Sequence, residues 1–152
     1  PVLQDTVNFV NAISLAKERS IKIKEEKSNE LEEFTNLISL SVTTDDRKTL
    51  RLCGSLFTKK DPRIVKINDF YIEAIPEGNM LIIYNFDKPG IIGNLGTLLG
   101  KHKINIAGMT FGRLKKGGQA ITVLNIDSPV LPNVLEKIKK LKYIKEVRTV
   151  RL

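Results

Sequence analysis

The chain has 152 residues, of which 41% are hydrophobic and 28% charged, a composition typical of globular domains and unlike that of disordered chains. No apolar run approaches the roughly 18 residues of a membrane-spanning helix and no signal segment opens the chain, so we expect a cytoplasmic protein that makes no membrane contact. The single cysteine, Cys53, allows no internal disulfide, and without a Cys/His cluster we expect no metal site and place Cys53 inside a buried strand.

The net charge of +8 is unevenly distributed. Residues 1–79 contain 12 basic and 13 acidic side chains, whereas residues 80–152 contain 13 basic and 4 acidic ones. Together with a cluster of turn-forming residues at 76–79, this asymmetry predicts two small domains, 1–78 and 79–152. The first residue is Pro1 and not methionine, which suggests a segment of a longer protein.

The first predicted domain combines one helix with several strands. The apolar residues of the helix recur at helical spacing and end near Ser20: Phe9, Val10, Ile13 and Ala16. Strands are expected at residues 21–24, 37–44, 50–57, 63–67 and 70–75, with a charged connection at 25–33. Alternation predicts one buried apolar face for each of two strands: Ile38, Leu40 and Val42, then Leu50, Leu52 and Leu56. Asn68 and Asp69 favour a hairpin between the last two strands.

The second predicted domain has the order strand, helix, strand, strand, helix, strand. The strands are expected at residues 80–84, 104–112, 119–126 and 145–152, with helices beginning near 87–90 and 128–129. The helices should bury two apolar stripes: Ile91, Ile92, Leu95, Leu98 and Leu99, then Val134, Leu135, Ile138 and Leu141. The third strand is apolar almost throughout, so we expect cover on both faces. The fold class is therefore α+β, with a strand-rich α+β domain followed by a ferredoxin-like βαββαβ domain.

The turn after the first strand of the second domain is a candidate ligand site. Asp87 and Gly90 lie where a strand gives way to a helix N-terminus, whose free amide groups favour an anion. A free amino acid suits this turn, because its carboxylate can take the amides and its ammonium the aspartate. The alternative is purely structural, with Asp87 as the helix cap, Pro89 in the first turn and Gly90 in a tight turn.

Three glycines inside the same helix suggest a close packing partner. Gly93, Gly96 and Gly100 each cost about 1 kcal/mol relative to alanine in a helix interior. The partner is either the sheet or a second copy of the chain.

Two families share sequence features with this chain. Residues 82–113, IIYNFDKPGIIGNLGTLLGKHKINIAGMTFGR, resemble the opening of an ACT domain, the ligand-sensing fold of amino-acid metabolism. Residues 1–28 and 53–80 resemble the intervening, or allosteric substrate binding, domain of long-form D-3-phosphoglycerate dehydrogenases. The resemblance implies the regulatory C-terminal part of an NAD-dependent enzyme of serine biosynthesis. It also implies that this segment has no catalytic residues or cofactor of its own and that NAD binds in separate catalytic domains.

The same resemblance implies specific effector-binding residues. In the ACT family of these dehydrogenases, L-serine binds between two subunits of a homo-oligomer. The matching positions are Asn85, Asp87, Gly90 and Ile91 in one subunit and Asn105, expected on the second strand, in its partner. Asp87 would face the ligand ammonium and Asn105 its carboxylate. Some relatives have histidine or tyrosine in place of Asn85, so the role of this residue is open.

A basic loop in the first domain is a second candidate site. Lys60, Arg63 and Lys66 could bind a phosphorylated metabolite, since guanidinium groups recognise phosphate. Resemblance matches only Arg63 to the anion site of some relatives, while Ile75 and Asn125 stand where relatives have arginine. A solvated charged loop is the alternative.

Three other functions remain to be weighed. An iron-sulfur L-serine dehydratase also joins related domains, although its opening sequence matches less well. The basic half could bind nucleic acid, but no interleaved aromatic residues accompany its lysines, so a solvated face is preferred and no nucleic-acid partner is expected. A free-standing enzyme lacks a nucleophile with its base, since His102, the only histidine, has no relay partner and should lie at the surface.

Overall fold

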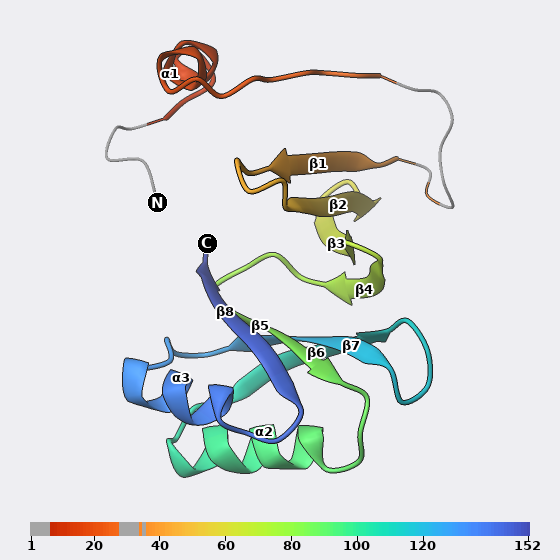
Figure 1. The fold of residues 1–152 in the computed structure, drawn as a ribbon, viewed down its shortest axis with the longest axis vertical. Coiled ribbons are helices and arrows are strands. Elements are labelled where there is room, and N and C mark those ends of the chain that lie inside the picture. Colours follow the sequence, from red (N-terminus) through yellow and green to blue (C-terminus); the bar gives the residue numbers. More distant parts are fainter. Residues whose placement is uncertain (1–6, 28–33, 35) are drawn as a thin grey trace. The chain divides into compact units, whose positions relative to one another are not determined.

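The computed structural model describes residues 7–27, 34 and 36–152. Their contacts form two compact units, Pro1–Leu31 and Glu32–Leu152. Two four-stranded sheets and two of the helices lie in the second unit (Figure 1). The predicted domain boundary near Gly78 thus falls inside one compact unit, and it remains a prediction.

The first unit contains helix α1 (Ala12–Glu18). It ends where expected, because Ser20 adopts φ 58° and the Ile21 amide donates to the Ala16 carbonyl at 2.8 Å. Of the predicted apolar stripe only Ala16 is buried, whereas Phe9, Val10 and Ile13 are exposed. The predicted strand at residues 21–24 is wrong, since these residues pair with no other strand in the described part of the chain.

The first sheet, sheet A, has the antiparallel order β1-β2-β3-β4. Its strands are β1 (Ile38–Thr43), β2 (Thr49–Thr58), β3 (Asp61–Ile67) and β4 (Phe70–Ala74). Ile67 pairs with Phe70 across a two-residue turn in which Asn68 has φ 51°, which confirms the predicted hairpin. Neighbouring strands are thus also neighbours in sequence, as expected of a meander.

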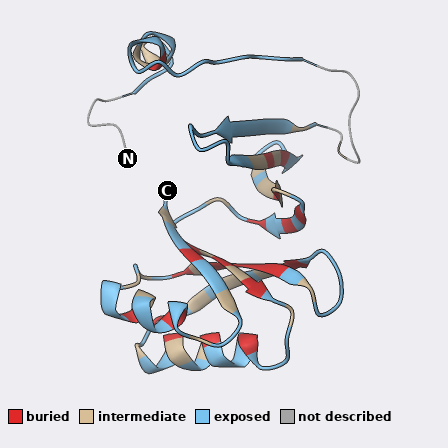
Figure 2. Ribbon diagram, viewed as in Figure 1, coloured by how far each residue is buried: buried red, intermediate tan, exposed pale blue. Residues whose placement is uncertain are grey.

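The predicted burial of β1 and β2 is wrong. All six residues of β1 are exposed, and Figure 2 shows this strand in pale blue throughout. In β2 the buried residues are Cys53 and Ser55, while Leu50 and Leu56 are exposed. The physical reason is that no described element of the second unit covers the outer face, and two register irregularities interrupt the pairing of β2 with β3. The buried position of Cys53 is as expected.

The second sheet, sheet B, has the antiparallel order β6-β7-β5-β8. Its elements follow the chain as β5 (Asn79–Phe86), α2 (Ile91–Lys101), β6 (Ile106–Arg113), β7 (Gln119–Ile126), α3 (Pro132–Lys139) and β8 (Ile144–Arg151). This is the βαββαβ order and strand arrangement of a ferredoxin-like fold, so the predicted fold class is confirmed.

Alternating residues of sheet B enter two different cores. On one face, the strand residues Leu81, Ile83 and Leu124 pack against the helices. Their helix partners are Leu95 and Leu99 of α2 and Ile138 of α3. Met80, Ile121 and Val123 point to the opposite face and pack against β3 and β4, where the partners are Ile67, Phe70, Ile72 and Ala74. Strand β7 is therefore covered on both faces, as its continuous apolar sequence predicts.

Both helices of this domain begin later than expected. Gly90, with φ 90°, is the N-cap of α2, so Asp87 does not cap the helix and Pro89 lies outside it. Helix α3 begins at Pro132 and not at Ser128, because Leu131 is still extended and Pro132 fits the first turn. Ile92 is exposed, while Ile91, Leu95 and Leu99 form the buried stripe of α2.

The glycines of α2 have no close packing partner in the described structure. A Cβ atom added to Gly93, Gly96 or Gly100 would meet no atom within 4 Å. The alternative in which the sheet packs against these glycines is therefore wrong, and only the second-copy alternative remains open.

Strand β4 of sheet A lies against β6 of sheet B. The contact is close at Gly112, where an added Cβ atom would stand 2.4 Å from the Tyr71 carbonyl oxygen and 2.9 Å from Cγ2 of Ile72. Close by, the Thr110 hydroxyl donates to the Glu73 carbonyl at 2.7 Å. The two sheets thus share a core and a hydrogen-bonded seam.

Candidate functional site

A hollow of about 470 Å³ lies at the end of sheet B where β5 leads into α2 and faces the hairpin between β6 and β7. Its lining includes three of the predicted effector-binding residues, Asp87, Gly90 and Ile91. Four further side chains or backbone segments come from the turn and the hairpin: Lys88, Arg113, Lys116 and Gly117. A strand end, a helix start and a hairpin tip therefore form one surface.

Asp87 is held by the hairpin. Its Oδ2 atom accepts hydrogen bonds from Nη1 of Arg113 at 2.8 Å and from the Gly117 amide at 3.0 Å. These two donors, the Gly117 amide first, lower the pKa of the Asp87 carboxyl below its ordinary value of 3.8, and Lys88 adds to this effect. Asp87 is thus an anion at neutral pH, and its Oδ1 atom accepts no hydrogen bond from the described residues.

The N-terminus of α2 opens into the same hollow. Gly90 provides no side-chain cap, and the Asn94 amide is the first to bond back, to the Gly90 carbonyl at 2.9 Å. The amides of the first helical turn, Ile91 to Gly93, therefore have no helical acceptor. The positive end of the helix dipole and these free donors favour a carboxylate or another anion at this place.

Asn85 does not line the hollow. Its side chain is fully buried, accepts a hydrogen bond from the Thr122 hydroxyl at 3.0 Å and donates to the Phe86 carbonyl at 3.0 Å. Both side-chain groups of Asn85 are therefore satisfied inside the sheet. A direct contact with a ligand, which the resemblance implies, has no support in this conformation.

Asn105 lies at the opposite end of sheet B. It precedes β6 by one residue and is exposed, and its amide donates to Oδ2 of Asp127 at 2.8 Å. Asp127 follows β7, whereas the hollow lies at the start of that eight-residue strand. The distance between Asp87 and Asn105 within one chain is thus on the order of 25 Å, since strands rise about 3.3 Å per residue.

Sequence reasoning missed the cationic residues of the hollow. Arg113 ends β6, opposite Ala120 in the register with β7, and so reaches the end of the sheet where β5 stops. Its exposed guanidinium group pairs with Asp87. The βαββαβ order contains the necessary signal, because in that fold the hairpin after the second strand lies at the same end of the sheet as the turn after the first.

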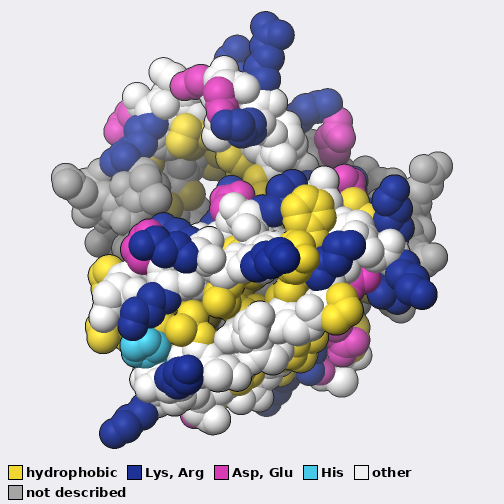
Figure 3. Space-filling model, turned by 60° about the horizontal axis from the view of Figure 1, so that its bottom comes forward, with side chains coloured by type: hydrophobic (Ala, Val, Ile, Leu, Met, Phe, Trp, Pro, Cys, Tyr) yellow, Lys and Arg dark blue, Asp and Glu magenta, His cyan; other side chains and the backbone are white. Residues whose placement is uncertain are grey.

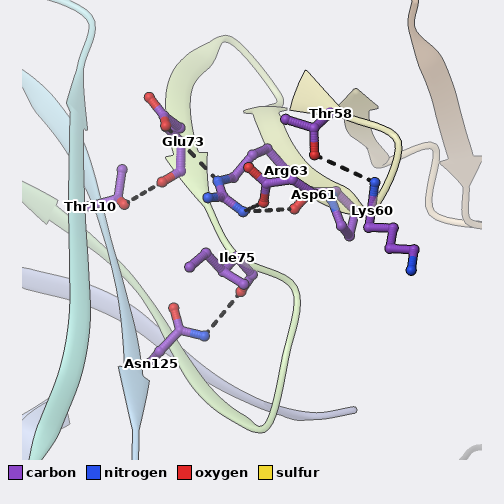
Figure 4. A network of polar contacts seen from close by, with 9 residues as sticks. Thr58, Lys60, Asp61, Arg63, Glu73, Ile75, Thr110 and Asn125 are labelled. Atoms are coloured by element: carbon purple, nitrogen blue, oxygen red, sulfur yellow. Dashed lines mark hydrogen bonds and ion pairs between the residues drawn. The ribbon is translucent and has the colours of Figure 1, made fainter. Parts of the chain in front are cut away.

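The predicted anion-binding residues do not converge. Arg63 forms ion pairs with Asp61 and, at 3.9 Å, with Glu73, and its guanidinium carbon lies 5.8 Å from the centre of the Phe57 ring. Lys66 donates instead to the Tyr71 hydroxyl at 3.3 Å. Figure 4 shows Lys60 directed away from Arg63. Because two carboxylates already neutralise Arg63, an anion would have to displace them, and the anion site remains a prediction.

Asn125, the other position considered for that site, instead joins the two sheets. Its side-chain amide donates to the carbonyl of Ile75 at 3.0 Å (Figure 4) and to that of Glu77 at 3.1 Å. Together with the bond from Thr110 to Glu73, it ties the connection after β4 to sheet B. Its role in this conformation is structural.

Basic side chains are spread over the one face of the molecule that Figure 3 presents. Figure 3 shows Lys and Arg side chains separated from one another by apolar and uncharged surface on the face that it presents. His102 ends α2, and its Nε2 atom lies 3.2 Å from Nζ of Lys137. Among the helices in the described part of the chain, none is long and apolar enough to span a membrane.

Two family matches cover most of the chain. Residues 1–68 match the D-3-phosphoglycerate dehydrogenase intervening domain, and residues 79–143 match the ACT domain. The first match includes α1 and β1 to β3, and the second includes the hollow, its hairpin and Asn105.

Proteins named D-3-phosphoglycerate dehydrogenase are among the relatives that the chain matches over its full length. The chain is 37% identical to the one from Methanocaldococcus jannaschii over all of its 152 residues, which cover 28% of that relative. It is 38% identical to the one from Archaeoglobus fulgidus and 37% identical to the one from Bacillus subtilis, again over its full length and 29% of each relative. The chain thus spans less than a third of the length of these relatives.

Proposed function

Since residues 1–68 belong to the D-3-phosphoglycerate dehydrogenase intervening domain family and residues 79–143 to the ACT domain family, we propose that the chain regulates such a dehydrogenase by binding L-serine. The ligand binds in the hollow between β5, α2 and the hairpin. A second copy of the chain completes the site. Binding then changes the activity of catalytic domains outside this sequence.

One observation carries this proposal: an anionic acceptor and free amide donors face the same hollow. The Oδ1 atom of Asp87 is open to a ligand ammonium, and the amides of Ile91 and Ile92 are open to a ligand carboxylate. Gly90 has no side chain, so a ligand can approach the backbone closely. Opposite charges on a strand end and a helix start suit a free amino acid in its zwitterionic form.

The position of Asn105 supports a site between two copies. Because Asn105 and Asp87 lie at opposite ends of one sheet, a small ligand that contacts both must take them from different chains. The open glycine face of α2 is compatible with a neighbouring copy. Regulation through a homo-oligomer follows from this arrangement.

NAD has no place in this segment under the proposal. Both sheets are antiparallel, whereas dinucleotide-binding folds use a parallel sheet with a glycine-rich turn at the helix start. NAD would bind in the catalytic domains of a longer protein, and no chemical step is assigned to the residues described above.

Calorimetry with L-serine tests the proposal directly. We expect saturable heat when L-serine is titrated into the 152-residue chain, and a weaker signal with D-serine, whose ammonium and carboxylate cannot both reach their partners with the same side-chain direction. Asp87→Ala should abolish binding. Absence of binding at millimolar L-serine would contradict the proposal.

Mixing two variants tests whether the site lies between copies. Asp87→Ala and Asn105→Ala should each abolish binding. A mixed dimer of the two variants should recover one site, since one of its two sites combines an intact Asp87 from one chain with an intact Asn105 from the other. Asp127→Ala is the control for the lost Asn105–Asp127 bond. If mixing restores no binding although mixed dimers form, the two residues do not share a site.

The alternatives are less well supported. The relatives named above are dehydrogenases, which favours this reading over an iron-sulfur L-serine dehydratase. The spread of basic side chains in Figure 3 gives no continuous track for a nucleic-acid backbone on that face.

A further inference from the structure

The hollow contains more positive charge than a zwitterion needs. Its ionisable lining residues are one carboxylate, Asp87, and three cations, Lys88, Arg113 and Lys116. Arg113 is engaged by Asp87 at 2.8 Å. Within the described part of the chain, Lys88 and Lys116 form no ion pair, although Lys88 contributes to the lowered pKa of Asp87, so the hollow is lined by two more cations than carboxylates.

These two lysines line the hollow from two chain segments, Lys88 from the turn after β5 and Lys116 from the hairpin between β6 and β7. Lys88 follows Asp87 directly, and its Nζ atom lies 4.0 Å from the position that a Cβ atom on Gly117 would occupy. Lys116 precedes Gly117, whose amide bonds to Asp87. Both lysines therefore belong to segments that are fixed to Asp87.

A neutral amino acid would leave this charge uncompensated. The ammonium of L-serine would enter a hollow that already carries an excess of positive charge and the positive end of α2. A ligand with a further acidic group would instead form charge-assisted hydrogen bonds with the free ammonium groups. A volume of about 470 Å³ also leaves room beyond a three-carbon amino acid.

We propose that the hollow prefers an amino acid whose side chain ends in a phosphate or a carboxylate, with Lys88 and Lys116 binding that acidic group. The inference rests on the proposed function, in which Asp87 and the amides of α2 bind the amino-acid part of the ligand. Lys88 and Lys116 then determine specificity, because the backbone and Asp87 make the same contacts with every amino acid.

Competing ligands on the full chain test this preference. Calorimetry with L-serine, O-phospho-L-serine, L-aspartate and inorganic phosphate should show that an acidic amino acid binds at least about tenfold more tightly than L-serine, the gain expected from one charge-assisted hydrogen bond. The preference should shrink with added salt, because the lysines are exposed to solvent. The two acidic ligands show whether phosphate or carboxylate is the preferred group.

Charge-removing variants show which lysines act. Lys88→Gln with Lys116→Gln should reduce the preference, measured as the affinity for the acidic amino acid divided by the affinity for L-serine, to about onefold. Lys115→Gln is the matched control, because Lys115 belongs to the same hairpin but does not line the hollow. A loss of preference in the control as large as in the double variant would show a general charge effect and overturn the assignment.

The possible results separate the two proposals. If L-serine binds and neither acidic amino acid binds more tightly, the inference fails and the proposed function stands. If inorganic phosphate binds as tightly as O-phospho-L-serine, the lysines hold an adventitious ion only and the inference fails. If no amino acid binds, both proposals fail.

Discussion

Sheets A and B have the same number of strands, yet they differ in sequence pattern and in burial. All six residues of β1 in sheet A are exposed, whereas six of the eight residues of β7 in sheet B are buried. Sheet B has two helices on one face and strands β3 and β4 on the other. Alternation thus gives a strand a potential buried face, and only a covering element makes that face a core.

The largest expected contrast is between equivalent leucine truncations in the two regions. Leu99→Ala, at a fully buried position in α2, should lower the free energy of unfolding by about 3 kcal/mol through lost burial and a cavity. Leu40→Ala, at a position 58% exposed in β1, should cost less than about 1 kcal/mol. Urea titrations followed by circular dichroism measure both. Equal costs would show that β1 is covered in solution.

A glycine substitution sharpens the comparison at the seam between the sheets. Gly112→Ala places a methyl group 2.4 Å from the Tyr71 carbonyl oxygen, so β4 and β6 must separate, at an expected cost of about 2 kcal/mol. The control is Gly108→Ala on the same strand, where the nearest atoms stand 3.8 Å away. Thermal unfolding midpoints should fall clearly for the first variant only. A similar fall for both would contradict the close contact.

The polar part of the seam should have a smaller effect. Asn125→Ala removes two hydrogen bonds to the connection after β4, and Thr110→Val removes one to Glu73. Each exposed bond is expected to contribute about 1 kcal/mol or less, so Asn125→Ala should cost more than Thr110→Val. Thr149→Val on the exposed face of β8 is the control. If all three variants have the same urea midpoint, the hydrogen bonds of the seam do not contribute to the free energy of unfolding.

The smallest expected effect concerns acid stability at the hollow. The pKa of Asp87 is lowered in the folded state, so its ionised form favours folding above the unfolded pKa near 3.8, and this contribution is lost as the pH falls through the lower folded pKa. Asp87→Asn should therefore weaken the pH dependence of the urea midpoint below pH 3.8 and have little pH-dependent effect at neutral pH. Asp69→Asn in the hairpin turn of sheet A is the control. If the urea midpoint of Asp87→Asn depends on pH below 3.8 as strongly as that of the unchanged chain, the lowered pKa of Asp87 is contradicted.

Sheet B could be predicted well because its signals are local and mutually consistent. Each strand and helix was found within a few residues, and the continuous apolar run of β7 predicts cover on both faces. The predicted start of α3 was wrong because two prolines, Pro129 and Pro132, each suit the first turn of a helix. In sheet A the strands were found but their buried faces were not, since burial depends on elements distant in sequence and on bulges such as the one at Cys53.

The candidate site was predicted in part. Asp87, Gly90 and Ile91 follow from local turn chemistry, and the structure brings them to one hollow. Arg113 and Lys116 required the three-dimensional position of the hairpin, because they lie more than twenty residues further along the chain. Asn85 is also close to the turn in sequence, but it lies inside β5 on the same buried face as Leu81 and Ile83, whereas Asp87 lies beyond the end of the strand.

Asn85 has a further consequence for strand pairing. Strands β5 and β7 are both so apolar that a slip by two residues would still bury hydrophobic side chains on the same faces. In the observed register Asn85 pairs with Ala120, so a slip that places it opposite Gly118 would separate Asn85 from Thr122. That slip would leave a carboxamide and a hydroxyl without partners in the interior, at a cost of about 1 to 3 kcal/mol for each. A single buried polar pair therefore disfavours slips in that direction, which hydrophobicity alone would tolerate, two residues before the chain reaches Asp87.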